Sequence, residues 1–174
     1  MKPIPEIISD VVAAVRSEYD TVGGEKPYFM HGHPREIVQI LSRKTSSSEW
    51  KYKKYPLIVL FQDFDEQING DIRTASLNIV ICTNTKNDFE ASERYEETFL
   101  TTLYPIFDLF MKHFKKSKYL NTLPANITYT KTDRLYWGRT GLYGNDGNIF
   151  NDFIDAIEIQ NLSASYLLNC NTLN

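Results

Sequence analysis

Cysteine is scarce in this sequence, and no long hydrophobic run is present. The two cysteines are Cys82, inside an apolar stretch, and Cys170, in a polar tail. Such a pair does not make a disulfide framework, so we expect free thiols in a reducing compartment. The cleanest apolar stretch, Leu57 to Phe61, is far shorter than the roughly 20 residues that span a membrane. The first residues also lack the apolar core of a signal peptide, so we expect no membrane association.

An excess of basic charge is also missing. The chain carries 19 lysines and arginines against 22 aspartates and glutamates, which gives a net charge of −3 and a pI near 5.6. This balance argues against a general nucleic-acid binder, which usually shows a basic footprint. One local exception is Trp50 to Tyr55, where lysines alternate with aromatic residues, a mixture that suits phosphates and bases. A solvated approach to the following strand explains the same stretch.

Length and composition indicate one globular domain over residues 1–174. A chain of 174 residues lies near the common domain size and can bury roughly two-thirds of its unfolded surface. Hydrophobic residues make up 42% and charged residues 24%. A disordered chain has fewer hydrophobic residues and a higher net charge, so we expect a folded protein.

Two helices are predicted in the first part of the chain. Apolar residues at spacings of three and four mark a helix from Pro5 to Tyr19, with a proline at its first position. A short extended piece, Pro27 to Pro34, follows. A second, short helix is predicted after Pro34, although a strand fits that stretch as well. Ser42 to Glu49 is polar and serine-rich, which predicts an exposed loop.

The centre of the chain predicts a β-hairpin and then a long helix. The strands of the hairpin run from Tyr55 to Phe64 and from Arg73 to Thr83. Between them lies Asn69-Gly70-Asp71, which supplies turn residues. The helix runs from Asp88 to Lys118.

This helix has one apolar stripe and one proline. Pro105 removes a backbone hydrogen bond, so we expect a kink there. The proline projects away from the stripe, which lets the bend wrap the helix around the core. Glu90 and Arg94 form a favourable four-apart pair outside the stripe. The stripe consists of Tyr95, Phe99, Leu103, Ile106, Phe110 and Phe114.

The last third of the chain predicts closing strands. One strand lies within Ile127 to Trp137, a glycine-rich loop follows from Gly138 to Asn148, and a terminal strand runs from Phe153 to Leu168. Strands joined by a tight turn must be antiparallel. We therefore predict an α+β fold, with a single antiparallel or mixed β-sheet packed on one face by the N-terminal helix and the long kinked helix.

The most prominent polar motif is His31-Gly32-His33. Alternate residues of a strand point the same way, so both imidazoles could reach one metal ion, with Glu36 as a third ligand. However, no cysteine or carboxylate cluster completes the ligand set. Turn histidines beside glycine and proline are the simpler interpretation, and we predict no metal site and no cofactor.

Two groups of carboxylates lie near strand ends. Paired carboxylates can do acid–base work or bind a hard cation. Acids at strand ends also commonly stay in solvent, which is the interpretation we favour for both groups. Since no nucleophile motif occurs either, the sequence predicts no catalytic residue. The groups are Asp63, Asp65 and Glu66, and Asp152, Asp155 and Glu158.

The glycine-rich stretch Gly138 to Asn148 resembles a phosphate-binding loop only superficially. A P-loop ends in Gly-Lys-Ser/Thr at the start of a helix, and this stretch has no such ending. We predict a surface loop that orders on contact with a protein partner. Arg139, Leu142 and Tyr143 would supply the contacts, since arginine and tyrosine are favoured at interfaces. A tolerated surface insertion is the alternative.

Four segments carry a family resemblance. They are Tyr55 to Phe61, Leu77 to Ile81, Arg94 to Pro105 and Asp155 to Ile159. With the N-terminal amphipathic helix in front of them, they resemble the tail-completion and tail-terminator proteins of tailed bacteriophages, also called minor tail or head–tail joining proteins, and related prophage proteins. The likeness covers most of the chain in order and length.

The resemblance implies a small structural subunit, without catalytic residues, that forms a ring, often a hexamer. Such a ring caps the tail tube or joins it to the neck, so the expected partners are other copies of the chain and other tail or neck proteins. The expected location is the virion, and the host cytoplasm during assembly. A second function stays open: a small ligand-binding or enzymatic domain with a pocket near Tyr28 to His33, lined also by Trp137.

Overall fold

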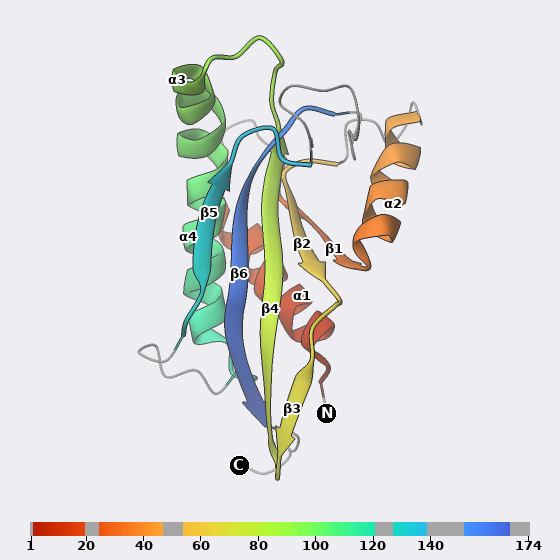
Figure 1. Ribbon diagram of the computed structural model, residues 1–174. Coiled ribbons are helices and arrows are strands. Elements are labelled where there is room, and N and C mark those ends of the chain that lie inside the picture. The colour runs from red at the N-terminus through yellow and green to blue at the C-terminus, as the bar shows by residue number, and fades with distance from the viewer. Residues whose placement is uncertain (1, 20–24, 47–53, 121–126, 139–151, 168–174) are drawn as a thin grey trace.

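The computed structural model describes residues 2–19, 25–46, 54–120, 127–138 and 152–167. It confirms an α+β fold built on one mixed six-stranded sheet (Figure 1). The strands follow the order β1-β2-β4-β6-β5, and β3 pairs with the beginning of β4. Their bounds are β1 Tyr28–Gly32, β2 Leu57–Phe61, β3 Glu66–Asn69, β4 Ile72–Asn84, β5 Thr130–Arg134 and β6 Ile154–Leu167.

The sheet is mixed because its first pair of strands is parallel. β1 and β2 run in the same direction, and helix α2 (Pro34–Ser46) lies between them in the chain, since parallel neighbours need a crossover connection. The other pairs, β2–β4, β3–β4, β4–β6 and β5–β6, are antiparallel. The predicted extended piece and short helix are therefore the first two parts of a β-α-β unit.

The predicted hairpin is confirmed with one correction. β2 and β4 are antiparallel neighbours, but β2 ends at Phe61 and does not continue to Phe64. The chain leaves the strand conformation at Gln62 to Asp65 before β3 joins the beginning of β4. The turn lies where it was predicted, between β3 and β4. Gly70 has a φ of 59° there, a left-handed conformation that glycine adopts at no steric cost.

Two helices cover one face of the sheet, as predicted. α1 (Ile4–Glu18) and α4 (Tyr104–Lys116) pack against each other, and Figure 1 shows both behind the strands. Ile8 of α1, Phe110 of α4 and Leu77 of β4 are completely buried in the core between these layers. Burial of each such side chain contributes about 1.5–3 kcal/mol, so this core joins both helices to the sheet.

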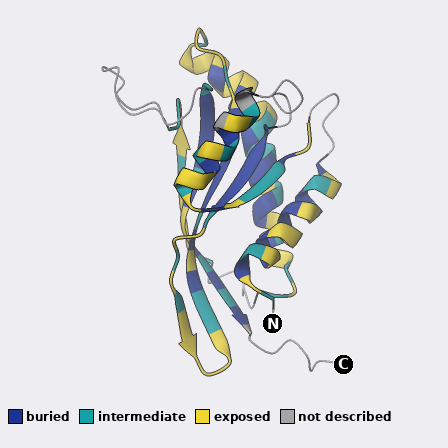
Figure 2. Ribbon diagram, turned by 90° about the vertical axis from the view of Figure 1, so that its right-hand side faces the viewer, coloured by how far each residue is buried: buried dark blue, intermediate teal, exposed yellow. Residues whose placement is uncertain are grey.

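Helix α2 packs on the opposite face of the sheet. Its buried residues Ile37 and Leu41 contact a second apolar cluster that includes Leu57 of β2. The outward side of α2 is mostly exposed (Figure 2). The helix continues to Ser46, so the predicted loop from Ser42 starts too early. Polar residues suit the solvent side of a helix as well as a loop, which is why composition alone misplaced this boundary.

The predicted long helix is confirmed as three consecutive segments. α3 (Ala91–Arg94) leads into a π-helix, η1 (Tyr95–Leu103), which leads into α4. At the end of η1 the N–H of Tyr104 donates to the carbonyl of Phe99, five residues back. Pro105 has no N–H to donate, and its ring crowds the carbonyl four residues earlier. The wider π turns accommodate this proline, and the helix is kinked without a break.

The π-helix changes which residues face the core. A π turn contains more residues than an α turn. An apolar stripe predicted at 3.6 residues per turn therefore no longer matches the buried side of the helix near its start. Tyr95, predicted in the stripe, is 49% exposed, whereas Arg94 is only 1% exposed. The predicted pairing of Glu90 with Arg94 is wrong, because Glu90 forms a capping box with Glu93. The stripe is buried as predicted from Phe99 onward.

The closing strands are confirmed in place and type. β5 lies inside the predicted Ile127 to Trp137, and β6 nearly fills the predicted Phe153 to Leu168. β6 pairs along almost all of β4, with a bulge where Asn161 has a φ of 54°. Below the helices, β3, the beginning of β4 and the end of β6 form an arm that projects from the body (Figure 2). This arm carries the exposed side chains of Ile68 and Ile72.

Candidate interaction surface

β5 is an edge strand. It pairs with β6 on one side, and no strand in the described part of the chain pairs with its other side. Upstream of β5, the N–H of Ser163 donates to the carbonyl of Thr128 at 3.0 Å, and downstream the N–H of Trp137 donates to the carbonyl of Ile154 at 2.8 Å. These bonds join the segments on both sides of β5 to β6. An edge of this kind offers unpaired backbone groups to another strand.

A row of aromatic side chains lines this edge. The rings of Tyr95 and Tyr104, from the long helix, meet edge to face with centroids 6.2 Å apart. Phe107 meets Tyr129, just before β5, at 6.3 Å. Tyr129 is 37% exposed, and Leu135, just after β5, is 47% exposed. The β5 surface consists of β5, its flanking residues Tyr129 and Leu135, and these helix rings.

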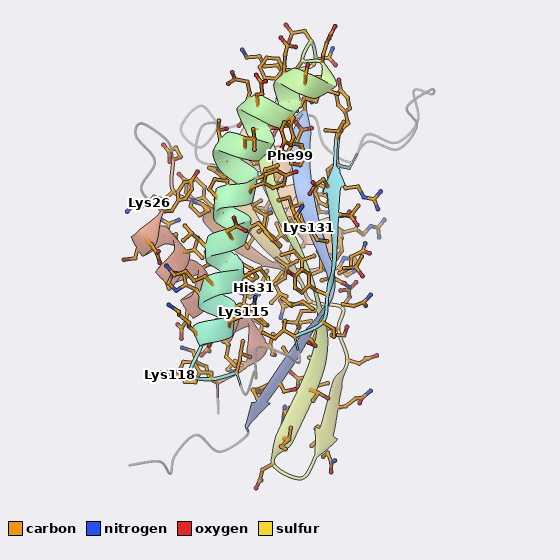
Figure 3. All side chains as sticks on the ribbon, turned by 90° about the vertical axis from the view of Figure 1, so that its left-hand side faces the viewer. Lys26, His31, Phe99, Lys115, Lys118 and Lys131 are labelled. Carbon is orange, nitrogen blue, oxygen red and sulfur yellow. The ribbon has the colours of Figure 1, made fainter. Side chains whose placement is uncertain are left out.

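Two opposite charges lie on the helix side of β5. Lys131 and Asp133 form an ion pair within the strand. The ammonium of Lys131 lies 4.7 Å from the centre of the Tyr104 ring, and Figure 3 shows Lys131 pointing toward the long helix. The hydroxyl of Tyr104 donates to Asp133 at 2.7 Å. Burial and this hydrogen bond raise the pKa of Tyr104 to about 12, so Tyr104 is a neutral donor at physiological pH.

A buried ion pair fixes the beginning of the long helix above this surface. Nη1 of Arg94 lies 3.2 Å from Oδ1 of Asp155, and the two side chains are 1% and 0% exposed. Nη2 of Arg94 donates to the carbonyl of Lys86 at 2.7 Å. The hydroxyl of Thr98 donates to Asp155 at 3.1 Å, and the ring of Tyr136 covers the guanidinium at 3.8 Å. The pair therefore joins the helix, β6 and the segment before α3, which is a structural role.

The two histidines considered as metal ligands make separate contacts. β1 ends at Gly32, whose φ is 144°, and the chain turns there into α2. Nδ1 of His31 lies 2.8 Å from Oε1 of Gln62. Nδ1 of His33 accepts from the backbone N–H of Arg35 at 3.2 Å, at the start of α2. Among the described residues, no three histidine, cysteine, aspartate or glutamate side chains are grouped in a way that could hold a metal ion.

The first group of carboxylates is divided between solvent and the arm. Asp63 and Asp65 are exposed. Glu66 accepts from the hydroxyl of Tyr166 at 2.7 Å and from Nη1 of Arg73 at 2.9 Å. Glu66 therefore ties β3 to β4 and β6, and the predicted solvated role is wrong for this residue.

The second group of carboxylates is also committed to structural contacts. Asp152 forms an ion pair with Lys54 at 2.5 Å, and the Lys54 side chain is only 4% exposed. Glu158 accepts from Nε1 of Trp137 at 2.7 Å and from Nε of Arg134 at 3.0 Å. With Asp155 buried against Arg94, none of the three has the solvated role that was predicted.

The alternative function depends on a pocket near Tyr28 to His33, and the three residues considered for its lining, Tyr28, His31 and Trp137, do not share one face of the sheet. Tyr28 and Trp137 pack on the α2 side of the sheet. His31 lies on the α1 side, because neighbouring residues of a strand point to opposite faces. A different hollow of about 850 Å³ lies on the α1 side, between the first turn of α1 and the side chains of Phe29, His31 and Phe64.

The predicted partner-binding residues Arg139, Leu142 and Tyr143 lie outside the described residues, so their contacts stay a prediction. The stretch 50–53 of the basic and aromatic segment lies outside them too. None of the helices in the described ranges is long and apolar enough to cross a membrane. Cys82 is a free, buried thiol, and burial raises its pKa.

The fold and this surface define a small α+β protein in which, over the described ranges, the sheet is open along β5 and exposed aromatic side chains lie beside this edge. No protein-family model and no curated protein matches this chain. The resemblance to phage tail-completion proteins therefore stays a prediction. The sequence-based predictions did not include Lys131 and Asp133. Their opposite charges, two residues apart in a threonine-rich strand, could have indicated a pair on one face of that strand.

Proposed function

We propose that this protein is a structural subunit of a phage or prophage particle that assembles with copies of itself and with other tail or neck proteins. It acts as a ring-forming tail-completion, tail-terminator or head–tail joining subunit, with no catalytic role. Its place is the virion, after assembly in the host cytoplasm. The observation that carries the proposal is the presence of two separate exposed apolar patches on one small protein.

The first patch is the tip of the arm, where Ile68 is 62% and Ile72 is 43% exposed. The second is the β5 surface, where Tyr95 is 49% and Leu135 is 47% exposed. The two patches lie on different elements, the first at the turn between β3 and β4 and the second along β5 and the long helix. A contact between different patches of identical subunits is head-to-tail, and it produces a ring when the rotation closes.

Deletion of the gene from the genome that encodes it tests the proposal. We expect induced particles with tails that are unfinished or not joined to heads, as seen by electron microscopy, and rescue by the complete chain. Normal particles after deletion would contradict the proposed function.

Substitution of the arm tip gives a sharper version of this test. Ile68→Lys with Ile72→Lys should fail to rescue assembly, because two charges replace the apolar contact of the arm. Gln67→Lys, on an exposed residue of the same arm, is the matched control and should rescue. The melting temperature should be nearly unchanged in both, since the altered side chains are exposed.

The alternative, a ligand-binding or enzymatic domain, has one supporting observation. The hollow between the first turn of α1 and β1 combines apolar Phe29 and Phe64 with polar His31 and Glu66, as small-molecule sites do. A thermal-shift screen of metabolites tests it. A ligand whose stabilisation disappears in Phe29→Ala with Phe64→Ala, together with normal particles after gene deletion, would favour this alternative.

A further inference from the structure

We infer that β5 pairs antiparallel with β5 of a second copy of this chain, across a two-fold axis at Thr132. The two sheets then join edge to edge into one continuous sheet. The strand is open on its outer side within the described part of the chain, and it is mostly exposed. Its sequence from Tyr129 to Leu135 is complementary to itself in this one register.

The charges of β5 are matched in this register. Lys131 lies opposite the partner's Asp133, and Asp133 lies opposite the partner's Lys131. Both residues are on the helix side of the sheet, since both contact the ring or hydroxyl of Tyr104. Opposite charges directly across an antiparallel pair are stabilising. On the other side of the sheet, Thr132 meets the partner's Thr132, which is also a favourable cross-strand pair.

The exposed apolar residues at the two ends of β5 are matched as well. Tyr129 comes just before β5 and Leu135 begins the turn just after it, so in this register the Tyr129 of each copy lies next to the Leu135 of the other, one such pair at each end of the paired strands. They are 37% and 47% exposed in the single chain. The two-fold contact therefore covers two of the few large apolar side chains that the described surface leaves in solvent.

Charged residues on an edge strand ordinarily oppose pairing with another sheet. Here they select a register. Moving the two-fold axis to Lys131 places two lysines against each other, and moving it to Asp133 places two aspartates against each other. Shifting the pairing of the two strands by one residue would place the helix-covered faces of the two sheets on opposite sides. Among these registers, only the one centred on Thr132 keeps the helix-covered faces of both sheets on the same side and also places each lysine opposite an aspartate.

The long helices agree with this geometry. The two-fold axis is perpendicular to the sheet, so the helices lie on the same face and run antiparallel. Tyr104 contacts β5 near the middle of the helix. The exposed acids Glu93, Glu96 and Glu97 lie near the beginning of the helix, and exposed Lys115 and Lys116 lie near its end. In this arrangement the acids of one copy and the lysines of the other are therefore at the same end of the dimer.

This inference goes beyond the proposed function, because a two-fold dimer does not close into a ring. It describes the free subunit, in which pairing protects an edge that would otherwise recruit other strands. The two ideas are tested on different material, purified chain for the dimer and induced particles for the ring, so either can fail alone.

A charge swap within β5 tests the dimer in analytical ultracentrifugation of the purified chain. Lys131→Asp and Asp133→Lys each place like charges across the axis twice, so each should raise the dissociation constant about tenfold or more. The double variant, Lys131→Asp with Asp133→Lys, restores unlike pairs and should restore the dimer. A monomeric wild-type chain overturns the inference, as does a double variant no better than the single ones.

Cross-linking tests the register. Thr132→Cys, with Cys170→Ser, brings two thiols together on the axis, where antiparallel neighbours have Cα atoms about 4.5–5.5 Å apart, a separation that a disulfide spans. It should give a covalent dimer on oxidation. Thr130→Cys is the matched control, because Thr130 lies opposite the partner's Arg134, and it should stay monomeric on a non-reducing gel. Equal cross-linking of both variants overturns the register.

Discussion

Arg94 shows how one residue can decide the local structure. Its guanidinium is buried and makes an ion pair with Asp155. Replacing one partner of a buried ion pair leaves the other charge without compensation, which costs about 3–5 kcal/mol. Arg94→Met should therefore lower the free energy of unfolding by about that amount in urea denaturation.

Arg134→Met is the control for this prediction. Arg134 also forms an ion pair, with Glu158, but its side chain is 52% exposed, and an exposed pair contributes only about 0–1 kcal/mol. Equal destabilisation by Arg94→Met and Arg134→Met would show that burial of the first pair has no energetic consequence.

Tyr166 makes stability depend on pH in the alkaline range. Burial and the hydrogen bond to Glu66 raise its pKa to about 12, from about 10 in an unfolded chain. Because the folded-state pKa is raised, the stability linked to neutral Tyr166 is complete below about pH 10 and is lost as pH rises toward 12. The stability difference between wild type and Tyr166→Phe should shrink over this range in unfolding experiments. A constant difference would contradict the assignment.

At the scale of elements, Gly32 joins β1 to α2. Its φ is 144°, and a Cβ atom there would lie 2.9 Å from Oε2 of Glu36. The Glu36 carboxylate is the end of a flexible side chain and can move aside, but L residues rarely adopt a φ of 144°. Gly32→Ala should therefore cost about 2–3 kcal/mol of stability, since strained backbone costs about 1–3 kcal/mol. Gly70→Ala should cost only about 1 kcal/mol, because its φ of 59° is left-handed but its surroundings are open. Chemical denaturation of both variants measures the contrast, and equal costs would contradict it.

The elements also show what local sequence determines. Apolar residues at spacings of three and four predicted α1. Alternating apolar residues bounded by turn residues predicted β4 and β6 almost to their ends. The π-helix was not predicted, because a widened turn before Pro105 leaves no periodic signal in the sequence. As a result Tyr95 was predicted in the buried stripe but is exposed, and Arg94 was predicted outside it but is buried. The position of β5 at an edge of the described sheet was not predicted either, because an edge position follows from the strand order, and the strand order depends on segments that are distant in the sequence.

At the scale of the whole molecule, charge is distributed unevenly although the net charge is only −3. Exposed acids gather near the beginning of the long helix, and exposed lysines near its end. Each group complements the helix dipole of its own chain. The same distribution gives an electrostatic attraction between two antiparallel copies of the helix. The charges therefore stabilise the helix within one chain and also favour the two-fold dimer.

This second role predicts how remote lysines affect the dimer. Lys115→Glu with Lys116→Glu should raise the dimer dissociation constant about three- to tenfold at low salt, because the partner's acids then face acids. Lys26→Glu with Arg35→Glu makes the same change in net charge at exposed residues, one labelled in Figure 3 and the other in α2 on the opposite face of the sheet, and should have a much smaller effect. Sedimentation at about 0.05 M and 1 M NaCl separates the cases, since the Debye length falls to about 3 Å at 1 M. The helix variant should approach wild type in high salt. An equal loss in both variants would mean that net charge acts alone, and that the long helices do not meet across the axis.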